Sequence, residues 1–262
     1  MPDPADSPAD WRALVVMPTY NEAENITTAV SSVLAAQPEL HVLIVDDSSP
    51  DGTGTIADSI AEDDDRVHVL HRLSKDGLGR AYLDGFEWGL ARHYDAIVEM
   101  DADGSHPADR LGALLAPLIT GRASLSIGSR WVPGGAVVDW PAARQALSRG
   151  GNRYVRMLLG ISVRDATAGY RAYTADLLRR WNFSDVHSHG YCFQIEMTLR
   201  AIDAGARVVE IPIVFRERRR GKSKMSRTIV AEAMLRVTWW GFLRRSRSLL
   251  RARRSFVGFL HR

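Results

Sequence analysis

Apolar, β-rich segments alternate with longer segments of helical periodicity through the first half of the chain. The β-rich segments are Ala13–Met17, His41–Val45, Arg66–Leu70, Ala96–Met100 and Ser124–Ile127. The helical segments are Glu22–Ala36, Thr55–Glu62, Gly79–Arg92 and Asp109–Ile119. Successive parallel strands need long crossover connections, which are usually helices that cover the faces of the sheet. The alternation therefore predicts an α/β fold with a mainly parallel sheet and helices on both faces.

The second half of the chain is less regular. Helical periodicity is present in Trp140–Leu159, which carries several arginines, and in Phe193–Ala204. A further strand is predicted at Arg207–Val214. The sequence contains no internal repeat and no low-complexity linker. Its 262 residues are compatible with one large domain, or with one domain and an appendage.

Conspicuous polar motifs follow directly after predicted strands. They occupy Pro18–Glu22, Asp46–Thr53, Asp101–His106 and Gly128–Gly135. In open sheets of this type, ligands bind beyond the carboxyl ends of the strands. The coincidence of polar motifs with strand ends therefore predicts a nucleotide site at this edge of the sheet.

Two carboxylates flank one alanine in Asp101-Ala102-Asp103, at the end of the fourth predicted strand. Side chains alternate along an extended chain, so both carboxylates point to the same side. Two hard oxygen donors can hold Mg²⁺ or Mn²⁺ beside a diphosphate, where the metal neutralises charge on a leaving nucleotide. An Asp-rich turn would explain these residues without a metal, but their place at a strand end, before His106-Pro107, favours the metal site.

A second acidic pair, Asp46 and Asp47, ends the second predicted strand. Carboxylates there can accept hydrogen bonds from a ribose or a base edge, whereas Ser49–Thr53 is typical of a turn that caps a helix. The nearby Gly77–Ala81 segment lacks the third glycine of a dinucleotide-binding fingerprint and does not follow the first strand. We therefore reject that interpretation.

Several basic residues are candidates for binding phosphate, because guanidinium groups pair with phosphate in a bidentate manner. They are Arg130, Arg144, Arg171, Arg218 and Lys224. No histidine of the chain has the His-Glu-x-x-His spacing of a zinc site. A transfer reaction onto a phosphate monoester needs no catalytic base, because such an acceptor is already anionic at neutral pH.

Charge is distributed unevenly over the chain, whose net charge is +3. From Arg216 to Arg262, fifteen Lys and Arg side chains face two glutamates, whereas acidic residues outnumber basic ones before this segment. From about Ile229 onward the segment is amphipathic, with Trp239, Phe242 and Leu243 on the face opposite most arginines. This pattern is typical of a helix in a membrane interface. The alternatives are packing of the apolar face onto the domain, or binding of nucleic acid by the arginines; the apolar face favours lipid.

The single cysteine, Cys192, excludes an internal disulfide and suits a reducing compartment. The segment Met1–Asp10 lacks the basic start and apolar stretch of a signal peptide. No run of about eighteen apolar residues is present, so we predict no transmembrane helix. We expect a cytoplasmic protein that lies peripherally on the inner face of the plasma membrane.

Together these motifs resemble the inverting transferases of glycosyltransferase family 2. The family-wide motifs are Pro18–Glu22, Val45–Thr53 and Met100–Asp103. Five later motifs are similar to the dolichol/polyprenol-phosphate mannose synthase branch: Gly128–Arg130, Asp165–Arg171, Gly190–Glu196, Ile211–Phe215 and Arg218–Lys224. The resemblance extends from about Trp11 to Met225.

The resemblance implies a GT-A fold, which is Rossmann-like, over residues 1–225, followed by a basic amphipathic helical tail at 226–262. It implies that Asp101 and Asp103 hold the metal, with Ser105 at a position where some relatives carry Gln. It places around the nucleotide Pro18, Tyr20, Glu22, Val45, Asp46, Asp47 and Ala102. It assigns contacts with donor diphosphate or acceptor phosphate to Arg130, Arg144, Arg218 and Lys224, and Arg130 joins the two metal-binding aspartates as a catalytic residue.

The resemblance further implies that GDP-mannose is the donor, that a polyprenyl monophosphate is the acceptor and that the β-linked product forms with inversion. A close alternative is a polyprenyl-phosphate glucose synthase that uses UDP-glucose, because details of the pocket decide the sugar. Some relatives carry transmembrane helices after the catalytic domain, so we also expect a membrane-embedded partner protein here. In some actinobacterial relatives that partner is an acyltransferase-like membrane domain. We expect no nucleic-acid partner.

Overall fold

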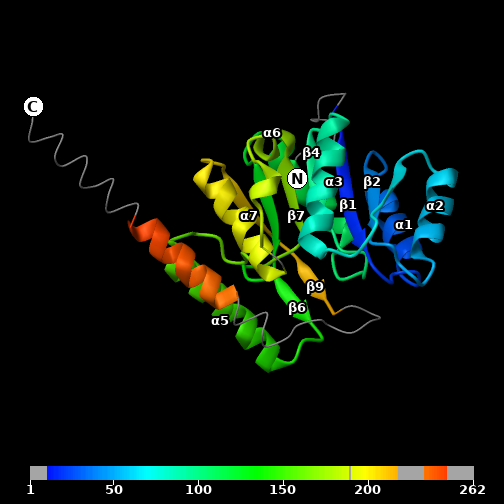
Figure 1. The fold of residues 1–262 in the computed structure, drawn as a ribbon. Helices are drawn as coiled ribbons and strands as arrows, with labels where there is room; N and C mark the ends of the chain where they lie inside the picture. Colours follow the sequence, from blue (N-terminus) through cyan, green and yellow to red (C-terminus); the bar gives the residue numbers. More distant parts are fainter. Residues whose placement is uncertain (1–10, 189, 218–232, 247–262) are drawn as a thin grey trace, which may run out of the picture.

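The computed structural model describes residues 11–188, 190–217 and 233–246. A seven-stranded sheet forms the centre of the molecule (Figure 1). From one edge to the other, the strands are β3 (Val67–His71), β2 (His41–Asp46), β1 (Ala13–Thr19), β4 (Ala96–Glu99), β7 (Arg171–Thr174), β5 (Leu125–Ser129) and β8 (Val208–Pro212).

All pairs in this sheet are parallel except those of β7, which is antiparallel to both β4 and β5. Because β7 is antiparallel to both neighbours, β4 and β5 run in the same direction. The carboxyl ends of β1, β2, β4 and β5 therefore meet at one edge of the sheet. A second, two-stranded parallel sheet pairs β6 (Ala136–Val138) with β9 (Val214–Arg216).

The helices connect these strands. They are α1 (Ile26–Ala36), α2 (Thr53–Asp63), α3 (Leu78–Ala91), α4 (Leu111–Ile119), α5 (Ala142–Leu159), α6 (Ala175–Leu178) and α7 (Tyr191–Asp203), with short 3₁₀ turns η2 (Ala108–Arg110) and η3 (Phe183–Asp185). A last helix, residues 233–246, lies beside α5 at the side of the molecule (Figure 1).

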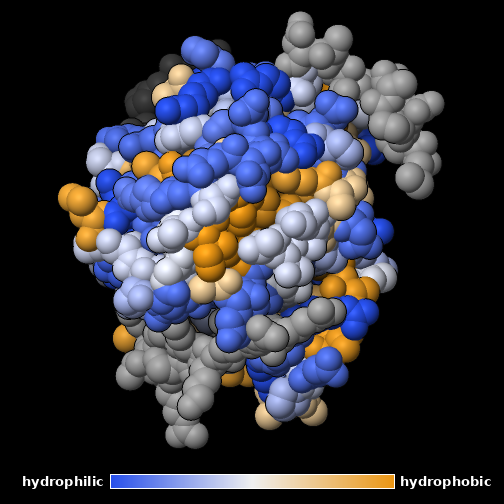
Figure 2. Space-filling model, turned by 90° about the vertical axis from the view of Figure 1, so that its right-hand side faces the viewer, coloured by the Kyte–Doolittle hydropathy of each residue, from blue (hydrophilic) through white to orange (hydrophobic). Residues whose placement is uncertain are grey.

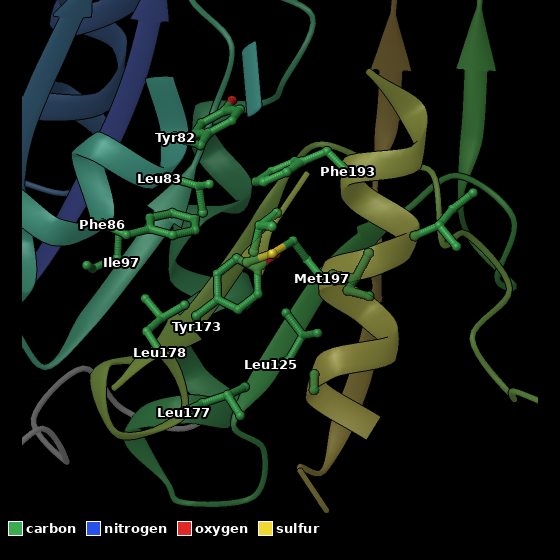
Figure 3. Close-up of a cluster of buried hydrophobic side chains, with 14 of the residues drawn as sticks. Tyr82, Leu83, Phe86, Ile97, Leu125, Tyr173, Leu177, Leu178, Phe193 and Met197 are labelled. Carbon is green, nitrogen blue, oxygen red and sulfur yellow. The ribbon is translucent and has the colours of Figure 1, made fainter. Parts of the chain in front are cut away.

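Two buried hydrophobic clusters lie on opposite faces of the sheet. Along β1 the side chains alternate between them: Leu14 and Val16 belong to one cluster, and Val15 and Met17 to the other. Helices α3 and α7 contribute side chains to the first cluster. Their aromatic side chains point toward each other and toward β7 (Figure 3). Because side chains on both faces of the sheet are buried, the strands are apolar throughout, as the sequence predicted.

The α/β fold with a mainly parallel sheet and helices on both faces is thus confirmed. The five predicted strands of the first half are β1–β5, and the helices between them are α1–α4. The prediction of one strand at Arg207–Val214 was wrong in its extent, because β8 ends at Pro212 and β9 begins at Val214 in the second sheet. Strands β6 and β7 were not predicted from the sequence.

The helix formed by residues 233–246 packs one face on α5 and leaves another exposed. Val237 is buried, the Thr238 hydroxyl lies 2.7 Å from that of Tyr154, and Arg244 forms an ion pair with Asp203 of α7. Exposed side chains on the other face are those of Leu235, Trp239 and Phe242. Packing onto the domain therefore accounts for one face of this helix and leaves its exposed apolar face unexplained.

The end of the molecule formed by α1 and α2 is mainly hydrophilic. Its hydrophobic surface is a narrow band and a few separate patches (Figure 2). Scattered apolar surface of this kind is normal for a folded protein and marks no site by itself. Among the described residues, no helix is long and apolar enough to cross a membrane.

Candidate active site

The turns that follow β1 and β2 are hydrogen-bonded to each other at the carboxyl edge of the sheet. The Asn21 amide donates to Oγ of Ser49 over 3.1 Å, and the Ala23 amide donates to Oδ2 of Asp51 over 3.1 Å. Asn21 and Ser48 have φ values of 61° and 55°, which non-glycine residues adopt uncommonly. Strained backbone in both turns points to a binding function.

The predicted nucleotide contacts of the first motif lie on this rim. Pro18 and Val45 are register partners on β1 and β2. The Lys75 ammonium lies 3.6 Å from the centroid of the Tyr20 ring. The Glu22 amide donates to the Thr53 hydroxyl over 3.0 Å, which joins the first motif to the amino end of α2. The structure thus brings together residues from two motifs that are 27–31 positions apart.

Asp46 and Asp47 have different surroundings. The Asp46 carboxylate accepts hydrogen bonds from the Thr19 hydroxyl (3.0 Å) and from the hydroxyl and amide of Ser49 (2.6 and 3.1 Å), so it fixes the turn. The Asp47 carboxylate pairs with the guanidinium of Arg72, which also bonds Asp84. Burial raises the pKa of Asp47, although Arg72 acts in the opposite direction.

The loop after β4 presents the two aspartates of the predicted metal site. The Tyr82 hydroxyl on α3 donates to Oδ1 of Asp101 over 3.0 Å, and Oδ1 of Asp103 accepts from the Ser105 amide over 3.0 Å. Gly104, which lies between Asp103 and Ser105, has a φ of 75°, a conformation that suits glycine. The loop thereby turns sharply and keeps both carboxylates at the end of β4.

His106 also stabilises this loop. Its Nδ1 accepts a hydrogen bond of 3.0 Å from the Asp101 amide, and its ring stacks on Tyr170 at a centroid distance of 5.1 Å. Burial lowers the pKa of His106, against the opposing effect of the neighbouring aspartates. A neutral ring with an unprotonated Nδ1 is the form that accepts this bond. His106 therefore positions Asp101.

The donor set at this loop fits a hard divalent cation only in part. Asp101 and Asp103 supply carboxylate oxygens, and the buried Ser105 hydroxyl has no hydrogen-bond partner among the described residues. Those residues contain no group of three or more His, Cys, Asp or Glu side chains arranged to hold a metal. Mg²⁺ and similar ions are commonly held by one or two carboxylates together with substrate phosphates. The loop fits a metal that is completed by a diphosphate.

Arg130 follows β5 at the same edge and is almost fully buried. Its guanidinium makes a bidentate pair with Asp165 through Nε (2.7 Å) and Nη2 (2.6 Å), and Nη2 also donates to Thr167. The Asn152 side chain on α5 bonds Thr167 over 3.0 Å. Trp140 and Phe215 each place a ring 5.5 Å from the guanidinium carbon. Arg130 is thus fixed rigidly beside the loop.

The other predicted phosphate ligands have separate outcomes. Arg144 forms an ion pair with Glu217 and lies 4.0 Å over the ring of Trp140. The prediction for Arg171 was wrong: this side chain is fully buried and donates to the carbonyls of Ala166, Ala168 and Gln194 and to the Thr198 hydroxyl, so it binds the chain itself. Arg218 and Lys224 lie outside the described residues.

Comparison with known proteins identifies the family of this chain. The sequence model of "Glycosyl transferase family 2" matches residues 14–181. The chain belongs to glycosyl transferase family 2. This family-2 protein is 53% identical over 95% of both chains to the "Polyprenol monophosphomannose synthase" of Mycolicibacterium smegmatis. It is also 53% identical over 89% of its length to the "Undecaprenyl-phosphate mannosyltransferase" of Micrococcus luteus, 96% of which is covered.

Solved structures of other transferases share the fold. A glucosyl-3-phosphoglycerate synthase from Mycobacterium tuberculosis superposes with a TM-score of 0.66 and 21% identity, over 88% of this family-2 chain and 81% of that one. A mannosyltransferase from Pyrobaculum calidifontis, solved with GDP-Man and Mn²⁺, gives 0.53 and 18%, over 97% and 82%. At this level of identity the likeness establishes the GT-A-like fold alone.

Several residues at the candidate site of this family-2 protein were not predicted from its sequence. Tyr82 reaches Asp101 from α3, and Arg72 and Lys75 contact the two predicted nucleotide motifs from the segment after β3. Basic residues directly after a third predicted strand were a usable signal, because β3 ends at the same edge as β1 and β2. Nothing in the sequence around Tyr82 indicates that its hydroxyl meets Asp101.

Proposed function

We propose that this protein transfers mannose from GDP-mannose to a polyprenyl monophosphate. The observation that carries the proposal is 53% identity, over 95% and 89% of the chain, to two proteins whose names specify mannosyl transfer to a polyprenyl phosphate. Identity of this extent covers all the motifs described above. The fold neighbours have too little identity to decide the donor.

The carboxyl edge of β1 and β2 would hold the nucleotide. Tyr20 and Glu22 on the first turn, and Asp47 on the second, would contact it, together with Pro18 and Val45 at the ends of β1 and β2. Asp46 would act indirectly, because its carboxylate is engaged by Thr19 and Ser49. Lys75 and Arg72 supply positive charge beside these turns. Together they would orient the diphosphate toward the loop after β4.

Asp101 and Asp103 would hold Mg²⁺ or Mn²⁺, and the buried hydroxyl of Ser105, unpartnered within the described ranges, would add a third oxygen. When bound, the metal supplies positive charge for the departing GDP. The protein prepares this position through three contacts: Tyr82 and His106 fix Asp101, and the Ser105 amide fixes Asp103. Ligands whose orientation is fixed by hydrogen bonds lose little freedom when the metal binds.

An acceptor phosphate oxygen would attack the anomeric carbon, and the bond from that carbon to the GDP oxygen would break. The acceptor is anionic at neutral pH, so no side chain has to remove a proton. Arg130 is fixed by Asp165 at the edge of the loop, and Arg144 lies on the same side, beside Trp140. These two arginines would place phosphate groups for in-line attack and inversion.

We also propose that the protein works as a peripheral protein on the inner face of the plasma membrane, where such an acceptor resides. The exposed side chains of Leu235, Trp239 and Phe242 support this proposal, because they share one face of the last helix. The rings of Trp239 and Phe242 stack at 6.2 Å. A membrane-embedded partner protein could cover the same face.

The function is tested by incubating the protein with radiolabelled GDP-mannose or UDP-glucose, a polyprenyl phosphate, and Mg²⁺, Mn²⁺ or EDTA. We expect labelled lipid from GDP-mannose with either metal and none with EDTA. If labelled lipid formed from UDP-glucose and not from GDP-mannose, the proposed sugar would be wrong and the protein would transfer glucose. Asp103→Ala should abolish transfer while the circular dichroism spectrum and melting temperature persist. Asp176→Ala, an exposed aspartate on α6, is the control and should remain active.

A further inference from the structure

A basic groove lies on the side of α5 that faces the loop after β5. It has a volume of about 830 Å³. Three arginines of α5 line it, Arg149, Arg153 and Arg156, and Arg164 closes it from the segment after the helix. Arg149, Arg153 and Arg156 are spaced by four and three residues, so they share one helix face. We call these four residues the arginine groove.

The arginine groove carries uncompensated positive charge. All four side chains are exposed, and none forms an ion pair within the described parts of the chain. The neighbouring carboxylates are already engaged: Asp165 by Arg130, and Glu210 by the backbone amides of Arg164 and Asp165. Like charges at this spacing repel one another. An anion bound between them would relieve that repulsion.

The groove also has an apolar wall. The Trp131 ring lies 4.6 Å from the guanidinium of Arg149. Met157, which is 66% exposed, and Ile161 line the same groove. Cationic and apolar side chains in one groove match a phosphate that is attached to an apolar chain.

The arginine groove is separate from the residues assigned to the reaction. Arg144 is on the same helix but one and a half turns before Arg149, and it pairs with Glu217 beside Trp140. Only Arg130 borders both places, and its guanidinium is turned to Asp165. Apart from Arg130, none of the described residues placed around the donor or the metal lines the groove.

We propose that the arginine groove binds the headgroups of anionic phospholipids in the membrane that holds the acceptor. This inference rests on the proposed function in one respect, namely that a lipid-borne acceptor brings the protein to a membrane. Charge complementarity selects anionic over zwitterionic lipid. The helix next to α5 exposes Leu235, Trp239 and Phe242, whose apolar side chains would add contacts with the membrane. Binding there would hold the carboxyl edge of the sheet close to the acceptor.

The test uses the full chain and vesicles that contain no polyprenyl phosphate, so it does not depend on transfer activity. Vesicles of phosphatidylcholine alone are compared with vesicles that also contain phosphatidylglycerol, by flotation at about 0.1 M salt. The groove variant carries Arg149→Gln, Arg153→Gln and Arg156→Gln. The control variant carries Arg92→Gln, Arg179→Gln and Arg180→Gln, three exposed arginines at other sites with the same loss of charge.

We expect wild type and control variant to float with the anionic vesicles, and the groove variant to bind them at least tenfold more weakly. A basic residue near an anionic surface strengthens binding by roughly fivefold, so three of them leave room for a larger loss. All three proteins should bind neutral vesicles weakly. The groove variant should keep the wild-type rate with a water-soluble short-chain acceptor phosphate, because its donor and metal residues are intact.

Several results would overturn the proposal. An equal loss in groove and control variants would show that net charge alone drives binding. A parallel loss of rate with the soluble acceptor would make the groove part of the acceptor site. Weaker binding of a DNA duplex by the groove variant, with vesicle binding unchanged, would identify nucleic acid as the occupant. Absent mannosyl transfer together with the expected vesicle result would instead contradict the proposed function alone.

Discussion

The hydroxyl of Tyr82 on α3 donates a 3.0 Å hydrogen bond to Oδ1 of Asp101 after β4. The two residues come from different elements, and Tyr82 is itself fully buried, with its ring stacked against Phe193 of α7. Burial raises the pKa of Tyr82 well above its ordinary value, so the hydroxyl stays protonated and remains a donor to the Asp101 carboxylate. The carboxylate is thereby held in one orientation before any ligand arrives.

Tyr82→Phe should weaken metal binding more than it weakens the fold. Removal of one outer hydrogen bond to a metal ligand typically lowers metal affinity by about 10–100-fold, whereas the free energy of unfolding should fall by only about 1 kcal/mol. The measurements are the Mn²⁺ concentration for half-maximal transfer and the melting temperature. Tyr94→Phe is a suitable control, because this hydroxyl contacts His41 at the opposite end of the sheet. An unchanged Mn²⁺ requirement in Tyr82→Phe would remove its proposed role.

Asp165→Ala should destabilise the protein strongly, because it leaves the guanidinium of Arg130 buried and unpaired. Removal of one partner from a buried ion pair costs about 3–5 kcal/mol, which corresponds to a melting temperature roughly 6–20 °C lower in a domain of this size. The exposed pair of Asp176 and Arg179 provides the comparison: Asp176→Ala should change the free energy of unfolding by less than about 1 kcal/mol. Similar melting temperatures for both variants would contradict this prediction.

The parts of the fold that follow from the sequence are those with a strong local pattern. Strands β1–β5 are apolar because both faces of the sheet are covered, and the turn residues after them mark their ends. Strand β7 has only four residues and begins at Arg171, whose charge is not what a central strand usually contains. Arg171 lies in the sheet because its guanidinium donates to the backbone carbonyls of Ala166 and Ala168 and to that of Gln194, 23 positions away on α7. No local pattern contains that information.

The same distinction applies to the site. Asp101 and Asp103 could be found because they share one short motif at a strand end. The pairing of Arg130 with Asp165 spans 35 positions, and the contact of Tyr82 with Asp101 comes from a helix before the strand. These contacts depend on how elements pack in three dimensions. Sequence motifs therefore predicted the chemical groups of the site, but not the side chains that orient them.

Gly85→Ala should destabilise the protein because α3 lies very close to β1 at this point. A Cβ atom at Gly85 would be 2.4 Å from Cγ1 of Val16, so the helix or the strand would have to move. Overpacking of this kind costs typically about 1–3 kcal/mol. Gly150 in α5 is the matched control, since no atom lies within 4 Å of its Cβ position; Gly150→Ala should stabilise the helix by up to about 1 kcal/mol. Chemical denaturation of both variants measures the difference, and the two changes should have opposite signs.

A pair of histidines at the far edge of the sheet should make the protein less stable as the pH falls below about 6.5. Nδ1 of His41 lies 3.3 Å from Nε2 of His68, so one ring donates and the other accepts, and the pair is neutral. Burial, and then mutual repulsion, lowers the pKa of His41, and burial followed by Arg92 and Arg12 lowers that of His68. In the unfolded chain both rings take up protons near their ordinary pKa. The unfolded state therefore binds more protons in this range, and the free energy of unfolding falls with decreasing pH.

The double variant His41→Gln/His68→Gln should flatten this dependence. Glutamine keeps a polar side chain at each position but does not titrate, so the proton uptake of the unfolded chain that disfavours the native state disappears. Urea denaturation at intervals from pH 8 to pH 5 gives the free energy of unfolding for both proteins. Their difference should be nearly constant above pH 7 and should shift in favour of the variant as the pH falls below 6.5. Parallel curves over the whole range would show that these two imidazoles do not govern acid sensitivity.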